Sequence, residues 1–140
     1  MLSIFNISST GINFYKNSLD AIAHNVANVN TVRTMDESAV RRQQVVGTAY
    51  TSSAPSMLGT GGTVGGGVSF KMVESATAVG VVTYDPDNLL ANEDGYVRRP
   101  DIDLTTEMAD MIIAQRGYQA NLAVVQRATE AYQAALQLGR

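Results

Sequence analysis

The sequence predicts a mainly α-helical fold, in which a long helix at each end of the chain pairs with the other and a small β-rich insert lies between them. Both chain ends carry apolar residues at alternating spacings of three and four, whereas the middle carries short β-favouring runs between turn formers. We expect residues 1–30 to form the first helix, 31–100 the insert with its loops, and 101–140 the second helix. The two helices should form a long, coiled-coil-like hairpin.

The first helix is predicted from an apolar stripe whose members are Ile12, Tyr15, Leu19, Ile22, Val26 and Val29. Phe5 lies one heptad before Ile12, and the opposite face is polar. Ser8, Ser9 or Thr10 can cap the start of such a helix. The turn-forming run of residues 28–31 predicts that the helix ends near Val29.

The insert is predicted from short β-favouring runs, at residues 45–46, 48–50, 68–73, 79–84 and 96–97. Partial alternation of apolar and polar residues in Val68–Val73 predicts one half-buried strand. The segment Gly59–Gly67 holds six glycines in nine residues, so we expect either a mobile loop or a segment that becomes ordered only against a partner.

The second helix is predicted from a longer stripe, in which eight of ten successive positions are apolar or tyrosine: Leu104, Met108, Met111, Gln115, Tyr118, Leu122, Val125, Thr129, Tyr132 and Leu136. A period of about 3.5 residues keeps such a stripe against a partner helix. A helix from Thr105 to Leu138 would be roughly 50 Å long. Gly139 stands where a C-terminal stop is expected.

Alanines occupy several other faces of the second helix with few charges among them, which favours close packing in a polymer over a solvated face. We therefore expect the two stripes to form an assembly interface. Its candidate residues are Ile12, Tyr15, Leu19, Ile22, Val26, Val29, Met108, Met111, Tyr118, Leu122, Val125, Tyr132 and Leu136.

Composition argues against several other classes of function. A net charge of -3 without a basic cluster predicts no nucleic-acid partner, and the absence of cysteine excludes disulfides and thiolate metal sites. The N-terminus lacks the basic and apolar regions of a cleaved secretory signal, and no run approaches the roughly 18 apolar residues of a membrane span. Export, if it occurs, is expected to use no cleaved signal.

Candidate catalytic and cofactor motifs are incomplete, so we expect no enzyme, no cofactor and no small-molecule substrate. The glycine-rich segment lacks the Lys and Ser/Thr of a phosphate-binding loop, and the Asp85-x-Asp87 start of a calcium loop is not continued. His24 is the single histidine. The carboxylate pairs Asp101/Asp103 and Glu107/Asp110 could in principle cleave glycans, but they lie in no evident pocket.

Three ordered motifs resemble proteins of the bacterial flagellum. Residues 22–31, Ile-Ala-His-Asn-Val-Ala-Asn-Val-Asn-Thr, resemble the N-terminal motif shared by rod, hook and hook-associated proteins. Residues 84–103 resemble the signature before the last helix of proximal-rod C-type subunits. Arg-Gly-Tyr-Gln-Ala-Asn at 116–121 and Leu-Gln-Leu-Gly at 136–139 are similar to that family's C-terminus.

This resemblance implies a structural subunit of the proximal rod, passing torque from the motor toward the hook as part of a helical tube. It further implies export through the flagellar type III apparatus, a periplasmic position in the basal body, and contact with other rod subunits, copies of itself and the MS-ring region. Three alternatives stay open: another axial subunit, a peptidoglycan-cleaving rod accessory, and a free coiled-coil adaptor.

Overall fold

The computed structural model describes residues 2–53, 63–76 and 79–139. The first and last elements along the chain are helices, α1 at Leu2–Asn28 and α2 at Leu104–Leu138. Between them lie four strands, namely β1 at Gln43–Ser53, β2 at Thr63–Glu74, β3 at Val81–Tyr84 and β4 at Tyr96–Arg99. They form two separate two-stranded antiparallel sheets. The predicted fold class, helical ends around a small β insert, is confirmed.

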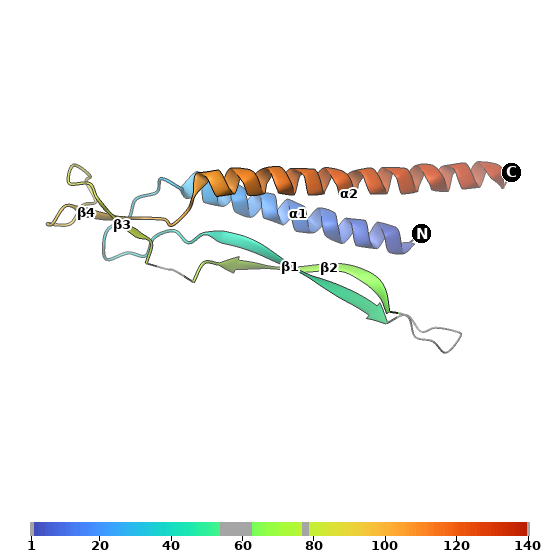
Figure 1. Ribbon diagram of the computed structural model, residues 1–140, viewed down its shortest axis with the longest axis horizontal. Helices are drawn as coiled ribbons and strands as arrows, with labels where there is room; N and C mark the ends of the chain where they lie inside the picture. The colour runs from blue at the N-terminus through green and yellow to red at the C-terminus, as the bar shows by residue number, and fades with distance from the viewer. Residues whose placement is uncertain (1, 54–62, 77–78, 140) are drawn as a thin grey trace.

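The two helices run antiparallel and side by side (Figure 1). The side chain of Asn25 contacts Glu107, Tyr15 lies against Gly117, and Gly11 lies against Asn121. Between successive contacts the two helices advance by equal numbers of residues, so one register is kept along the pair. In that register the first residue of α1, Leu2, lies near residue 130 of α2, and the last turns of α2 extend past the N-terminus (Figure 1).

The ends of α2 agree with the prediction, and α1 lies within the predicted range 1–30, but the predicted cap of α1 does not exist. Asp103 caps α2, because its carboxylate accepts hydrogen bonds from the amides of Thr105 and Thr106. The predicted cap at Ser8, Ser9 or Thr10 is wrong, because α1 already begins at Leu2. Ser8 is instead a buried residue inside the helix. The heptad that relates Phe5 to Ile12 already indicated the earlier start.

The strands β1 and β2 form a long ribbon that packs on α1 (Figure 1). A bulge interrupts their pairing, because Tyr50 faces Gly67 while Thr51 faces Gly65, which leaves Gly66 as an additional residue. A β-carbon at Gly66 would strike the Tyr50 ring. Gly67 has a φ of +119° and lies against Thr10 of α1, a position and a conformation that glycine alone accepts readily.

The glycine-rich segment is therefore part strand. Residues 63–67 belong to β2, which corrects the expectation of a loop or a partner-ordered segment there, while residues 59–62 lie outside the described residues. Its close contacts are made within the chain. The half-buried strand predicted at residues 68–73 exists, yet Phe70 and Val73 are exposed and Val68 is partly buried, because the ribbon is covered on one side by a single narrow helix.

The β3–β4 hairpin lies at the end of the molecule where α1 ends and α2 begins, which we call the hinge end; the opposite end, with both termini, is the terminal end (Figure 1). At the hinge end, Arg33 and Arg98 form an antiparallel β-bridge through hydrogen bonds of 2.9 and 3.0 Å between their backbone groups. Ala39, Val97 and Ile102 are buried beside it. The bridge thus joins the segment after α1 to the strand before α2.

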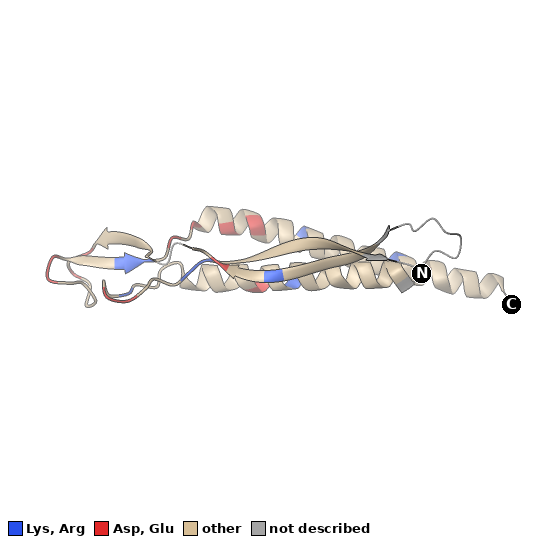
Figure 2. Cartoon of the chain, turned by 90° about the horizontal axis from the view of Figure 1, so that it is seen from below, with Lys and Arg blue, Asp and Glu red and all other residues tan. Residues whose placement is uncertain are grey.

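Charged residues are unevenly distributed along the molecule (Figure 2). Residues 2–15 and 131–139, which form the terminal end of the helices, contain none. The accessible surface is 9752 Å², compared with about 7,000 Å² expected for a compact monomer of this mass. The chain is thus long and thin, with little of its apolar surface enclosed. Among the described residues, no helix is long and apolar enough to cross a membrane.

Candidate functional site: the helix pair and its buried polar cluster

Four polar side chains meet where α1, α2 and the segment leading into β1 come together at the hinge end; we call Asn25, Arg42, Glu107 and Asp110 the polar cluster. Asn25 and Glu107 are both fully buried, at 0% exposure. Buried polar groups are costly unless they are hydrogen-bonded, and here each of them has partners within the cluster or the adjacent backbone.

Asn25 joins three elements through one amide side chain. Its Oδ1 accepts a hydrogen bond of 2.8 Å from the backbone N–H of Gln43. Its Nδ2 donates to the carbonyl of Gln43 at 2.7 Å and to Oε2 of Glu107 at 3.0 Å. The amide therefore pairs with the first residue of β1 as a neighbouring strand would, and at the same time holds α2 through Glu107.

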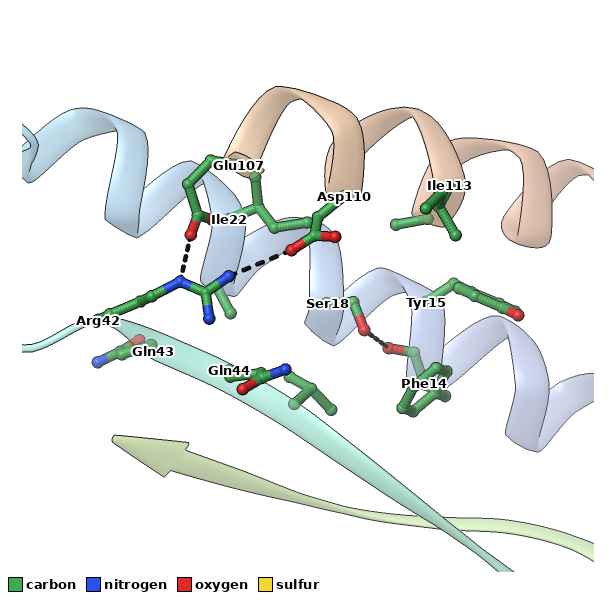
Figure 3. Close-up of a pocket in the computed structure, with 13 residues that line it drawn as sticks. Phe14, Tyr15, Ser18, Ile22, Arg42, Gln43, Gln44, Glu107, Asp110 and Ile113 are labelled. Carbon is green, nitrogen blue, oxygen red and sulfur yellow. Dashed lines mark hydrogen bonds and ion pairs between the residues drawn. The ribbon is translucent and has the colours of Figure 1, made fainter. Parts of the chain in front are cut away.

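Arg42 completes the cluster from the β1 side (Figure 3). Its Nε lies 2.5 Å from Oε1 of Glu107, and its Nη2 lies 3.1 Å from Oδ2 of Asp110. Glu107 and Asp110 are three residues apart on α2 and so share one face of the helix. One guanidinium can therefore bind both carboxylates, and the charge of the buried Glu107 is compensated.

A pocket with a cavity volume of about 170 Å³ opens beside Arg42. Its floor is α1, and its two sides are β1 and α2 (Figure 3). The lining is mostly apolar and includes Phe14, Tyr15, Ile22 and Ile113. The pair Glu107/Asp110 therefore borders a pocket, which corrects the expectation from the sequence, and each of the two carboxylates is bound to Arg42.

The remaining candidate chemistry is also tied to local structure. Asp85 binds the side chain of Asn88 at 3.1 Å and lies 3.6 Å from Arg99, which is the pattern of a stabilised turn. No group of three or more acidic or histidine side chains suited to a metal ion occurs in the described part of the chain. The hydrogen bonds from the Thr106 hydroxyl and from the amides of Thr105 and Thr106 lower the pKa of Asp103, as expected for a helix cap.

The thirteen predicted interface residues divide into two groups. Ile22 is buried, and eight others are partly buried within the chain: Ile12, Tyr15, Leu19, Val26, Val29, Met111, Tyr118 and Val125. The other four, all on α2, are exposed: Met108, Leu122, Tyr132 and Leu136. The stripes are thus only partly used for pairing α1 with α2. The four exposed residues remain predicted interface residues, and α1 does not bury them.

Sequence reasoning missed the residues that make the closest contacts between the helices. They are small or polar: Gly11, Asn25, Glu107, Ala114, Gly117 and Asn121. A search for apolar positions passes over them. On α2 they lie at spacings of seven, three and four, which keeps them on one face of the helix, and that helical spacing was the available signal.

An apolar surface remains open on α2 outside the helix pair. Leu104, Met108, Ile112 and Ile113 are exposed near the hinge end, and Tyr132, Leu136 and Leu138 near the terminal end. All of residues 129–139 are exposed, since α1 does not reach them. Exposed apolar side chains that gather in groups of this kind are typical of protein–protein contact.

Comparison with known proteins agrees with this geometry. Residues 93–138 match a family model described as flagellar basal body rod FlgEFG protein C-terminal. The chain is 32% identical to the flagellar basal-body rod protein FlgC of Borreliella burgdorferi, over 97% of this chain and 95% of that protein. The chain belongs to the FlgC family of flagellar basal-body rod proteins.

Other relatives carry the same description. FlgC of Salmonella typhimurium is 34% identical over 89% of this chain and 87% of its own length, and FlgC of Bacillus subtilis is 27% identical over 96% and 95%. The chain is therefore a structural component of the flagellar basal-body rod.

Proposed function

We propose that this FlgC-family chain is a stiff subunit of the proximal rod, in which the exposed apolar surface of α2 packs against neighbouring subunits. The observation that carries the proposal is the excess of accessible surface, 9752 Å² against about 7,000 Å² for a compact monomer. A chain that leaves so much apolar surface uncovered gains stability when partners cover it.

The two ends of the molecule contribute differently to this assembly. The last turns of α2 have no counterpart in α1 and carry Tyr132, Leu136 and Leu138 on an uncharged segment. We propose that they pack on neighbouring rod subunits or on other copies of this chain. Closely packed helices resist shear, which suits a tube that transmits torque from the motor toward the hook.

The environment of the subunit follows from the same proposal. It would be exported through the flagellar type III apparatus without a cleaved signal, and would assemble in the periplasm close to the MS-ring region. The proposal includes no enzymatic activity, no cofactor and no small-molecule substrate. It is supported by the engagement of Glu107 and Asp110 with Arg42, which leaves that carboxylate pair to a structural role.

A substitution at the overhang of α2 tests the proposal. Leu136 is 55% exposed and lies beyond α1, so Leu136→Asp should leave the helix content of the isolated chain unchanged. In an assembled rod the carboxylate would be buried and would have to be desolvated or protonated, which is unfavourable. Swimming in soft agar should therefore be lost while the subunit is still made. Leu122→Asp should act in the same way.

Gln126→Asp is the matched control, because it places the same carboxylate at an exposed polar position of α2. It should swim like the wild type, and circular dichroism should show the same helix content for all three variants. Normal swimming of cells that carry Leu136→Asp would remove the overhang from the assembly interface.

A further inference from the structure

We propose that the contact of Asn25 and Arg42 with Glu107 sets the register in which α1 pairs with α2, so that these three are positioning residues of the rod subunit. This inference concerns the chain's own helix pair and goes beyond the proposed assembly. It begins from the apolar stripes, which repeat with a period of about 3.5 residues on both helices.

Such a repeat does not by itself define one register. Sliding α2 by one heptad, about 10.5 Å for seven residues at about 1.5 Å each, places apolar and small residues opposite one another again. Ser18 would then face Asn121 instead of Ala114. Most of the apolar contact area along the pair would be recovered after such a slip, because the stripe on α2 continues beyond α1.

The polar cluster behaves differently, because it occurs once. In the observed register Asn25 donates to Glu107 at 3.0 Å, and both side chains are fully buried. A slip in one direction would place Asn25 opposite Ala114 and move Glu107 past the end of α1. A slip in the other would place Asn25 opposite residues that precede α2. Either way, Asn25 would lose its hydrogen bond to Glu107, and Glu107 would lose its partners Asn25 and Arg42, which is unfavourable for groups that are buried.

Arg42 strengthens this selection because it comes from a third element. It binds Glu107 and Asp110 together, and it precedes Gln43, whose backbone is held by Asn25. The start of β1 is thus fixed to α1 and α2 at the same point. A slip would break the contacts of Arg42 with Glu107 and Asp110, because the contact of Asn25 with Gln43 holds the start of β1 on α1.

The glycine contacts are the competing explanation. Gly117 accepts the ring of Tyr15, and Gly11 accepts the side chain of Asn121, both in the observed register. These are contacts with the ends of partly exposed side chains, which can rotate away from the helix pair. Glu107 and Asn25 have no such freedom, because they are completely enclosed.

The test replaces the ion pair by apolar residues of similar volume, Arg42→Met/Glu107→Met. Such replacements of buried ion pairs are often neutral for stability, so register and stability are measured separately. The chain has no cysteine, and two engineered pairs report the register in the purified full-length chain under mild oxidation. Ser18→Cys/Ala114→Cys reports the observed register, and Ser18→Cys/Asn121→Cys reports a slip of one heptad.

With the polar cluster intact, we expect the variant with cysteines at 18 and 114 to form its disulfide, and the variant with cysteines at 18 and 121 to form none above background. With Arg42→Met/Glu107→Met, the 18–121 disulfide should rise at least tenfold over its background. The exposed pair Arg33–Glu37, at 3.0 Å, supplies the matched control, and Arg33→Met/Glu37→Met should leave the crosslinking pattern unchanged. Peptide mapping by mass spectrometry identifies each disulfide.

A rescue variant separates register from stability. Arg42→Met/Glu107→Asn restores a buried amide pair opposite Asn25, a device that fixes register in coiled coils, and should return the 18–121 disulfide to background. Three results would each overturn the proposal: a retained single register in the double methionine variant, loss of both disulfides there, or failure of the asparagine rescue. Because the isolated chain is used, the outcome is independent of rod assembly.

Discussion

The hinge end and the terminal end of the same helix pair are built in opposite ways. At the hinge end, buried residues from α1, α2 and the insert enclose a charged pair, and a β-bridge joins the segments that flank the helices. At the terminal end, α2 continues without α1, carries no charged residue from 131 to 139 and exposes every residue from 129 to 139. One helix thus has an interior at one end and open apolar surface at the other.

This difference separates two requirements of a rod subunit. The hinge end contains what a single chain needs to define its own shape, because the side chains of its polar cluster are paired within the chain. The terminal end exposes apolar side chains of α2, which under the proposed function are covered by neighbouring subunits. Helices gain most of their stability from packing of an apolar face, so the two ends should differ in stability before assembly.

The largest expected effect comes from breaking the hinge end. Glu107→Ala removes the buried carboxylate that Arg42 and Asn25 share, and breaking a buried ion pair typically costs roughly 3–5 kcal/mol. Arg42 keeps its contact with Asp110, and Asn25 keeps its contact with Gln43. We expect the lower value, since the Arg42 side chain keeps 25% of its exposure and can be hydrated. Urea unfolding of the purified chain, followed by circular dichroism, measures the change in the free energy of unfolding.

Glu37→Ala is its control. Glu37 pairs with Arg33 at an exposed position, and exposed ion pairs contribute about 0–1 kcal/mol. Equal losses of stability in the two alanine variants would show that the hinge end is not the stable part of the chain.

Hydrogen exchange of the isolated wild-type chain compares the two ends directly. Amides of α1 and α2 near Asn25 and Glu107 should exchange at least about 100-fold more slowly than those of residues 131–138, a difference of roughly 2.7 kcal/mol in opening free energy. The first turns of α1 should also exchange fast. Uniform protection along α2 would contradict the expected difference in stability between its two ends before assembly.

The ribbon contributes an intermediate effect through its bulge. Gly67→Val forces a branched side chain into a φ of +119° and against Thr10, and strained backbone of this kind costs about 1–3 kcal/mol. A β-carbon at Gly65 meets nothing within 4 Å, so Gly65→Val should be nearly neutral. The two variants are compared by thermal unfolding of the isolated chain, and equal destabilisation by both would contradict the role of the bulge. Loss of swimming with Gly65→Val at unchanged stability would indicate that a neighbouring subunit covers the ribbon surface.

The smallest effect is expected at the cap of α2. Hydrogen bonds from Thr106 and Thr105 lower the pKa of Asp103 below its usual 3.8, so the ionised carboxylate is the form that stabilises the helix. Its contribution is fully present above pH 3.8 and disappears as the pH falls through the lower folded pKa. An NMR titration of the Asp103 carboxyl carbon with a midpoint at or above 3.8 would show that the cap is not formed in solution.

Much of the fold could be predicted from the sequence, because the apolar period of 3.5 is long and uninterrupted on α2 and each strand of the insert is bounded by turn formers. The cap of α1 was predicted at the wrong place because Ser8, Ser9 and Thr10 are good caps in isolation. Ser8 is instead tolerated inside the helix, where a small side chain can be buried.

The closest contacts between the helices could not be predicted from apolarity. Asn25 and Glu107 resemble solvent-facing residues in a sequence, and only their mutual contact and that with Arg42, 65 residues before Glu107 in the chain, allow them to be buried. The same holds for Gly67, whose role depends on the strand register and on the approach of Thr10. Both depend on contacts between distant parts of the chain.

The β-bridge between Arg33 and Arg98 brings the two ends of the insert together. Residues 34–97 begin and end at this point, because the two arginines pair through their backbones. Within that segment the β1–β2 ribbon packs on α1, whereas the β3–β4 hairpin lies beyond the ends of the paired helices (Figure 1). Lengthening or exchanging the turn between β3 and β4 would therefore leave the distance between the end of α1 and the start of α2 unchanged. The surface that this hairpin presents can vary while the pairing of α1 with α2 stays the same.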